Sequence, residues 1–176
     1  MRSNWLAPCL AAALLIAAPA SADETAAEAF ATLSKLQGRW EGEFANSNKH
    51  SVDYRLSAGG SVLVETWTLG PQRESITMYH LDGDRLLATH YCPQGNQPRL
   101  KRVDDGDPNR FSFAFVDGTG LQAADGWHQD SFWVEVQGDT LYLRDEVYAP
   151  NDPASKEEEG DSPPVTYRRV AAAPAG

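Results

Sequence analysis

Apolar and polar residues alternate with a period of two along most of the chain, from residue 38 almost to its end. A β-strand turns successive side chains to opposite faces, so this alternation is typical of strands that are buried on one face. Groups of glycine, aspartate and serine interrupt it at intervals of about eight to twelve residues. The pattern predicts ten strands, at residues 38–45, 50–57, 61–69, 74–81, 85–92, 97–103, 110–116, 127–137, 140–148 and 165–170.

Most connections between these strands are short. Residues 58–61, 81–84 and 137–140 each contain the glycine or aspartate that a tight hairpin needs at positive φ, so consecutive strands should be antiparallel neighbours. An open sheet of this kind leaves two unpaired edges, and closure removes both. We predict an all-β fold, an up-and-down antiparallel β-barrel of about ten strands. Residues 117–126 and 150–164 are expected to form longer loops.

One segment before the first strand has a different period. Within residues 23–36, Ala27, Phe30, Leu33 and Leu36 recur at three-residue spacing, and acidic residues occupy the first turn, as the helix dipole favours. This predicts one short amphipathic helix, and the sequence indicates no second one.

Residues 1–22 have the composition of a secretory signal peptide. Arg2 supplies a positive start, an apolar stretch follows at 6–19, and Ala20 and Ala22 provide the small residues of a cleavage site. The stretch is shorter than the roughly 20 residues that cross a bilayer. We therefore predict cleavage after Ala22, a periplasmic or secreted location, and a mature chain without a transmembrane segment. Residues 23–170 would then form the barrel domain, and residues 171–176 a disordered tail.

Charge and cysteine content narrow the classes of function. The chain has 15 Lys and Arg against 25 Asp and Glu, a net charge of −10, which argues against nucleic acid as a partner because that binding needs cationic contacts. Loss of Cys9 with the signal peptide would leave Cys92 as the single thiol, so no intramolecular disulfide could form. Cys92 is expected to be a small buried apolar residue rather than a nucleophile.

Gly38-Arg39-Trp40 follows the predicted helix, and Arg168 and Arg169 lie in the last predicted strand. On these residues the chain resembles the calycin superfamily of lipocalins, fatty-acid-binding proteins and nitrobindin-like barrels. The resemblance implies that Arg168 or Arg169 lies over Trp40, since lipocalins often place a basic residue there. Residues 78–86 and 89–99 look like an uncharacterised family of exported bacterial lipocalin-like domains. The resemblance implies a barrel that holds a small hydrophobic molecule or, in the nitrobindin-like members, haem bound through a histidine. It brings no established activity.

The hairpin registers predict which polar residues face the interior. Tyr54 should lie opposite Glu65, which places a carboxylate on the apolar face, where burial without a partner is costly. Around the turn at Asp82 and Gly83, Thr77 and Tyr79 share a face with His90, whereas His80 points to the other side.

The hairpin at residues 127–148 adds further candidates. Pairing Val136 with Leu141 and Val134 with Leu143 would turn His128, Asp130 and Asp145 inward. The same register would turn outward Trp133, Glu135, Tyr142 and Arg144.

Inward polar residues on separate strands indicate a ligand site within the barrel. The candidates are Glu65, Thr77, Tyr79, His90, His128 and Asp130, with Asn96, Gln97 and Arg99 at a rim. Trp40, Trp67, Phe113 and Phe115 are expected as aromatic walls. Any one of the polar residues could instead make a cross-strand hydrogen bond, lie at a wet barrel mouth or form a turn.

We therefore predict an exported barrel that binds a small, partly apolar ligand, either hydrophobic or amphipathic, without a cofactor. The sequence carries no motif for a reaction, so the chain is not predicted to be an enzyme. The alternatives are an enzyme that uses Glu65 or His90 as general acid or base, and a barrel of nitrobindin type with haem on His90 or His128. Two further readings are a zinc or copper site at His90, Cys92 and His128, and an envelope interaction module that uses the acidic loop 150–164.

Overall fold

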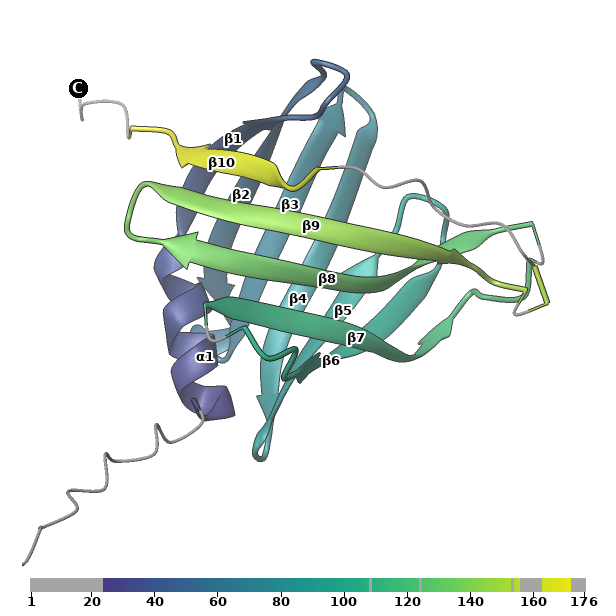
Figure 1. The fold of residues 1–176 in the computed structure, drawn as a ribbon, viewed down its shortest axis with the longest axis horizontal. Helices are drawn as coiled ribbons and strands as arrows, with labels where there is room; N and C mark the ends of the chain where they lie inside the picture. Colours follow the sequence, from purple (N-terminus) through teal and green to yellow (C-terminus); the bar gives the residue numbers. More distant parts are fainter. Residues whose placement is uncertain (1–23, 108, 124, 153, 156–162, 172–176) are drawn as a thin grey trace, which may run out of the picture.

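The structure is a computed structural model that describes residues 24–171, with the exception of 108, 124, 153 and 156–162. Within these residues ten antiparallel strands form a closed barrel (Figure 1). The strands are β1 (Gly38–Glu43), β2 (Lys49–Ser57), β3 (Val62–Gly70), β4 (Arg73–Asp82), β5 (Arg85–Tyr91), β6 (Gln97–Val103), β7 (Arg110–Thr119), β8 (Trp127–Gln137), β9 (Leu141–Pro150) and β10 (Val165–Arg169).

Each strand pairs with its neighbours in the sequence, and β1 pairs with β10 to close the barrel. This confirms the predicted all-β, up-and-down fold. Strands β6 and β8 have the predicted bounds, whereas β7 and β9 continue to Thr119 and Pro150, into segments expected to be loops. Closure leaves no unpaired sheet edge among the ten strands.

A helix packs over one end of the barrel. It comprises α1 (Ala26–Leu33), which continues as a 3₁₀ turn (Ser34–Leu36), and Thr25 and Glu28 form a capping box at its start. It lies against β4 and β5, and Leu33 and Leu36 are buried in the same core as Trp40. The predicted signal peptide lies outside the described residues, as does the predicted tail apart from residue 171.

The helix is held to the barrel at the seam between β1 and β10. The indole nitrogen of Trp40 donates a hydrogen bond to the Leu36 carbonyl oxygen at 2.6 Å. The guanidinium of Arg169 lies 4.2 Å from the centre of the Trp40 ring and also donates to the backbone carbonyls of Lys35 and Gln37. Of the two arginines expected over the tryptophan, Arg169 therefore fills the role, which adds about 0.5–2 kcal/mol.

Below the helix the barrel interior is filled by side chains. Leu86, Leu100, Phe113 and Val134 are at most 1% exposed, and the Phe113 ring stacks on the Phe132 ring at 4.7 Å. Among the described residues, the interior at this end of the barrel is therefore a packed core.

The register predicted for the β8–β9 hairpin is wrong by one residue. Val136 pairs with Tyr142 and Val134 with Arg144, because the loop between Gln137 and Leu141 has three residues, whereas the predicted strands leave only residues 138 and 139 between them. Side chains alternate along a strand, so a one-residue slip moves every side chain to the other face. Tyr142 and Arg144 consequently point inward and are 0% and 2% exposed. The inward placement predicted for Asp145 is wrong for the same reason.

A β-bulge changes the other half of this hairpin. Gln129 pairs with Tyr148 and Ser131 with Val147, which leaves Asp130 as an extra residue in β8. The inward and outward alternation of side chains that holds from Phe132 backward along β8 is therefore interrupted at Asp130. Gln129 is fully buried, whereas Asp130 is partly exposed.

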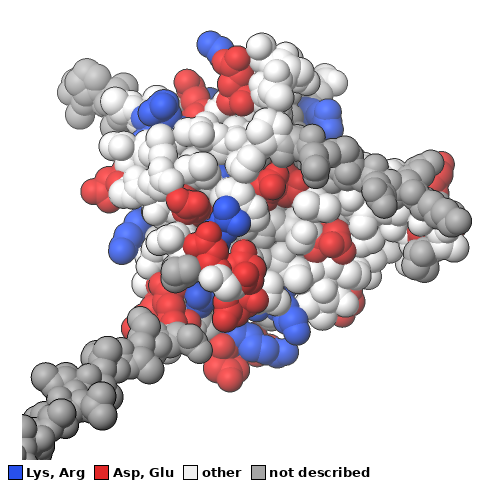
Figure 2. Space-filling model, in the orientation of Figure 1, with Lys and Arg blue, Asp and Glu red and all other residues white. Residues whose placement is uncertain are grey.

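On the face shown in Figure 2, basic side chains lie among acidic ones rather than in a patch of their own. Several of them form surface ion pairs, such as Arg39 with Asp53 and Arg99 with Asp117. Within the part of the chain that the structure describes, no helix is long and apolar enough to cross a membrane.

Candidate functional site

A cavity of about 530 Å³ lies in the half of the barrel away from α1. The helix packs against β4 and β5, and its Ala26 shares a surface depression with Arg85 at the start of β5. The cavity, in contrast, is lined by Arg73 at the start of β4 and Cys92 just after β5. Three aromatic residues also line the cavity at this end of the barrel: Phe44 after β1, Trp127 at the start of β8 and Tyr148 near the end of β9. The barrel is thus packed at one end and hollow at the other.

The walls of the cavity are mainly apolar and aromatic, with contributions from Phe44, Trp67, Leu69, Trp127 and Tyr148. Two of these rings belong to a stack. The imidazole of His50 lies between Phe44, at 4.0 Å, and Trp67, at 5.2 Å between ring centres. The stack fixes the rings along this wall, so part of the cavity surface is preformed.

A buried ion pair forms the floor. Nη1 of Arg144 lies 3.0 Å from Oε1 of Glu65, and the two side chains are 1% and 0% exposed. Glu65 also accepts hydrogen bonds from the Tyr54 hydroxyl at 2.9 Å, the Trp67 indole at 2.6 Å and the Tyr79 hydroxyl at 2.5 Å. Both carboxylate oxygens are therefore occupied, which offsets the cost of burying the charge.

The tyrosines of this network remain protonated. Burial, and next the negative charge of Glu65, raise the pKa of Tyr54 and of Tyr79 well above the ordinary value for tyrosine. Burial likewise raises the pKa of Tyr142, whose hydroxyl lies 3.5 Å from that of Tyr54. The hydroxyls of Tyr54 and Tyr79 therefore keep their protons at pH 7 and donate hydrogen bonds to Glu65.

His90 lies beside this network and lines the cavity. Its Nδ1 is 3.0 Å from the Thr77 hydroxyl, whereas Nε2 is buried without a hydrogen-bond partner. Burial, and then the nearby charge of Arg144, lower the pKa of His90 to about 4. His90 is therefore a neutral imidazole at pH 7.

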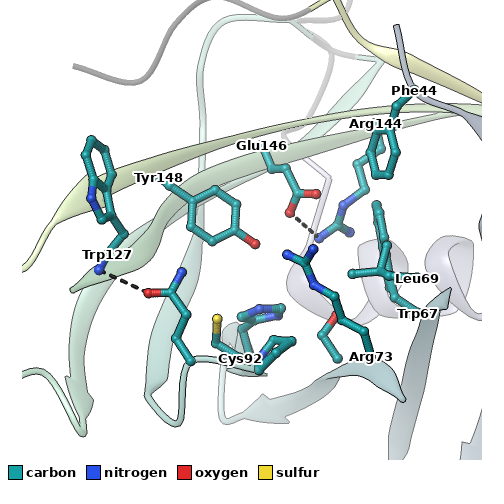
Figure 3. Close-up of a pocket in the computed structure, with 13 residues that line it drawn as sticks. Phe44, Trp67, Leu69, Arg73, Cys92, Trp127, Arg144, Glu146 and Tyr148 are labelled. Carbon is teal, nitrogen blue, oxygen red and sulfur yellow. Dashed lines mark hydrogen bonds and ion pairs between the residues drawn. The ribbon is translucent and has the colours of Figure 1, made fainter. Parts of the chain in front are cut away.

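Three charged side chains, Arg144, Glu146 and Arg73, lie close together in the cavity (Figure 3). Nη2 of Arg144 lies 3.8 Å from Oε2 of Glu146, and the same oxygen accepts a hydrogen bond from the Gln129 amide at 2.5 Å. Arg73 is exposed, and its guanidinium points into the cavity. Cys92 is half-buried in the wall, and burial raises the pKa of its thiol, so it is not an activated nucleophile.

Four of the predicted site residues meet at the floor. Tyr79 bonds to Glu65 and Thr77 to His90, and the predicted β4–β5 register is confirmed because Thr77 pairs with His90. The prediction that Tyr54 lies opposite Glu65 is confirmed as well. His90 is the member of this group that contributes to the cavity lining.

The other five predicted residues lie elsewhere, and none lines this cavity. The Asn96 amide donates to the Trp127 carbonyl at 2.7 Å, the His128 ring contacts Asn151, and Gln97 accepts from Thr119. Arg99 is on the exposed surface in its pair with Asp117. Asp130 is the bulged residue of β8. Of the four predicted aromatic walls, Trp67 lines the cavity, whereas Trp40 and Phe113 lie in the packed core. Phe115 does not line the cavity, and its ring lies 4.6 Å from the His128 ring.

Sequence reasoning missed Arg144, Glu146, Arg73 and the aromatic pair Trp127 and Tyr148. One signal pointed to Arg144: a carboxylate facing the interior at Glu65 needs a buried cation. The register that turns Arg144 inward supplies that cation.

No group of three or more His, Cys, Asp or Glu side chains that could hold a metal ion occurs within the described ranges. His90 and Cys92 are both near the cavity, but His128 does not line it.

Comparison with known proteins identifies no matching family model and no matching curated protein. A solved structure of a protein of unknown function from the DUF3598 family of Nostoc punctiforme is similar, with 13% sequence identity and a TM-score of 0.44. The match covers 77% of this chain and 48% of that one, so the chain spans about half the length of that protein.

Proposed function

We propose that the protein is an exported barrel that binds one small, partly apolar molecule in the cavity opposite α1. The observation that carries the proposal is the cavity itself, about 530 Å³ in volume and lined by aromatic side chains. Ligand pockets in proteins span about 300–1,000 Å³ and combine apolar walls with few polar groups.

Two buried polar atoms beside the cavity support this proposal. Nε2 of His90 and Nε of Arg144 have no hydrogen-bond partner, although both side chains line the cavity. A buried polar group without a partner costs about 1–3 kcal/mol. A ligand whose polar group reached either atom, after a small movement of the side chains that cover it, would recover part of that cost.

Export and membership of the calycin superfamily form the finer part of the proposal. Export is inferred from the charged start, apolar stretch and small residues of positions 1–22. The resemblance to calycins is supported by Arg169 over Trp40 and by a helix across one end of a closed barrel. Members of that superfamily that bind small hydrophobic molecules do so inside the barrel.

Filling the cavity tests the proposal. Ser75 is 6% exposed and lines the cavity, so the Ser75→Phe side chain should occupy space that a ligand needs. Thr68→Phe is the matched control, because Thr68 is exposed on the outer face of β3. Nile red, an uncharged dye that fluoresces in apolar surroundings, serves as the probe. We expect wild type and Thr68→Phe to bind it equally and Ser75→Phe to bind at least about tenfold more weakly, a loss of about 1.4 kcal/mol.

Equal dye binding by Ser75→Phe and Thr68→Phe, with both variants folded by circular dichroism, would place the dye outside the cavity and refute the proposal. Absence of binding to wild type would also refute it.

A second candidate is a function of His90, favoured by its partnerless Nε2. As a neutral imidazole His90 could accept a proton from a bound substrate, whereas Glu65 is saturated by its four neighbours and does not line the cavity. His90 is also the residue that would hold haem iron, if the barrel were of nitrobindin type. An absorbance titration with haemin separates these readings: a histidine-ligated spectrum that is lost in His90→Ala would favour haem.

A further inference from the structure

The charges around the cavity balance. Arg73 and Arg144 line it as cations, Glu146 lines it as an anion, and Glu65 lies directly beneath, paired with Arg144. These are two positive and two negative side chains. The balance does not reflect the whole molecule, whose net charge is −10.

The other titratable groups of the floor and wall add no charge at pH 7. The low pKa of His90 keeps the imidazole neutral, and burial raises the pKa of the Cys92 thiol, which keeps its proton. The hydroxyls of Tyr54 and Tyr79 donate to Glu65 and stay protonated, because burial raises the pKa of both. The electrostatic character of the cavity is therefore set by its four charged side chains.

A balanced set of charges disfavours an ionic ligand. A charged group that enters a partly buried cavity loses hydration, and opposite charge together with hydrogen bonds in the protein must compensate for that loss. Here the attraction of an anion to Arg73 and Arg144 is opposed by repulsion from Glu146 and Glu65. An uncharged ligand avoids the larger part of the hydration cost.

The walls favour a flat ring. Figure 3 shows Trp127 and Tyr148 on one side of the cavity and Phe44 and Trp67 on the other. Aromatic pairs in stacked or edge-to-face arrangements contribute about 0.5–1.5 kcal/mol beyond the burial of area. A planar aromatic ligand could contact both sides.

The floor offers one defined donor. Nε of Arg144 carries a hydrogen, has no acceptor, and is buried, so a small movement of the side chains that cover it would bring it within reach of a ligand. A carbonyl oxygen is an uncharged acceptor that suits it.

We propose that the cavity selects an uncharged, planar aromatic molecule that carries a carbonyl oxygen, and that Glu146 is the residue that excludes its anionic relatives. This inference rests on the proposed function, since it specifies the ligand class of the same cavity. Glu146 occupies the position for this role, because its carboxylate lines the cavity near Arg144 and is partly exposed.

Two naphthalene probes of nearly equal shape test the charge rule. 2-Naphthamide is neutral, whereas 2-naphthoate is an anion at pH 7, and both have a carbonyl oxygen on a planar ring. Calorimetric titration of the full chain should show the amide binding about tenfold or more tightly than the carboxylate, equivalent to about 1.4 kcal/mol. Glu146→Gln leaves the cavity with a net positive charge, so the carboxylate should gain affinity and the preference should fall below about threefold.

Glu74→Gln is the matched control. It removes one negative charge on the outer face of β4, beside Arg73, from a residue that does not line the cavity. The preference for the amide should be unchanged. Arg73→Gln is the complementary variant at an exposed position and should increase the preference, because it leaves the cavity with a net negative charge.

Tighter binding of 2-naphthoate by wild type would overturn the inference. An unchanged ratio in Glu146→Gln would do the same or, should that variant fail to fold, an unchanged ratio in Arg73→Gln. If neither naphthalene binds while Nile red does, the inferred selection by Glu146 between these two relatives is overturned and the proposed function stands, because Nile red is itself an uncharged planar aromatic molecule with a carbonyl oxygen. If Nile red also fails to bind, both fall.

Discussion

At the scale of single residues, Glu65 holds the floor of the cavity together. Its carboxylate receives hydrogen bonds from Tyr54, Trp67, Tyr79 and Arg144, which come from four different strands. Low local polarity strengthens each of these bonds and makes the loss of one partner expensive for the others. The role of Glu65 is therefore to fix the side chains that surround the cavity.

Removal of Glu65 should destabilise the fold strongly. Glu65→Ala removes the closer of the two carboxylates that pair with the buried Arg144 guanidinium and leaves Glu146 at 3.8 Å, and breaking a buried pair costs about 3–5 kcal/mol. Urea unfolding monitored by tryptophan fluorescence measures the change in the free energy of unfolding. Arg99→Ala breaks the exposed pair with Asp117 and should cost far less. Similar losses in the two variants would show that the buried network does not stabilise the protein.

His90 gives the protein a stability that depends on pH. Its pKa rises from about 4 in the folded chain to the ordinary 6.5 on unfolding, so between these values the unfolded chain binds more protons. This contribution is complete above pH 6.5 and is lost as pH falls toward 4, by about 3 kcal/mol in all. Between pH 7 and pH 4, wild type should therefore lose about that much more stability than His90→Gln in urea unfolding. Equal losses would contradict a neutral buried His90.

At the scale of elements, period-two alternation sufficed to predict all ten strands and their order. It also placed Glu65, Thr77 and His90 correctly, because the turns at Gly59 and Gly83 are short and their parity follows from the residues present. Where the turn length fixes which side chains of a strand face inward, the residues of the candidate floor could be predicted from the sequence.

The β8–β9 hairpin shows where that reasoning fails. The loop around Gly138 could have two or three residues with little difference in sequence, yet this choice decides whether Arg144 or Asp145 faces inward. The sequence gives no signal for the bulge at Asp130 either, since a bulge adds one residue without changing the composition of the strand. Both errors concern register, and both removed true lining residues from the prediction.

At the scale of the whole molecule, the two ends of the barrel differ in how their interior is filled. The end under α1 is filled by residues such as Leu86 and Phe113, whereas the opposite end holds the cavity. Stability can thus reside in one half while the other half stays open. No local pattern encodes this division, because it depends on how side chains from all ten strands fill the interior.

The most direct test of the account is native mass spectrometry of the full chain after incubation with an excess of Nile red. We expect one bound dye molecule on wild type and on Thr68→Phe, and none on Ser75→Phe, because the cavity beside Ser75 is the binding site. A wild-type chain that carries no dye, or a Ser75→Phe chain that carries as much as wild type, would contradict the claim that the barrel holds its ligand in this cavity.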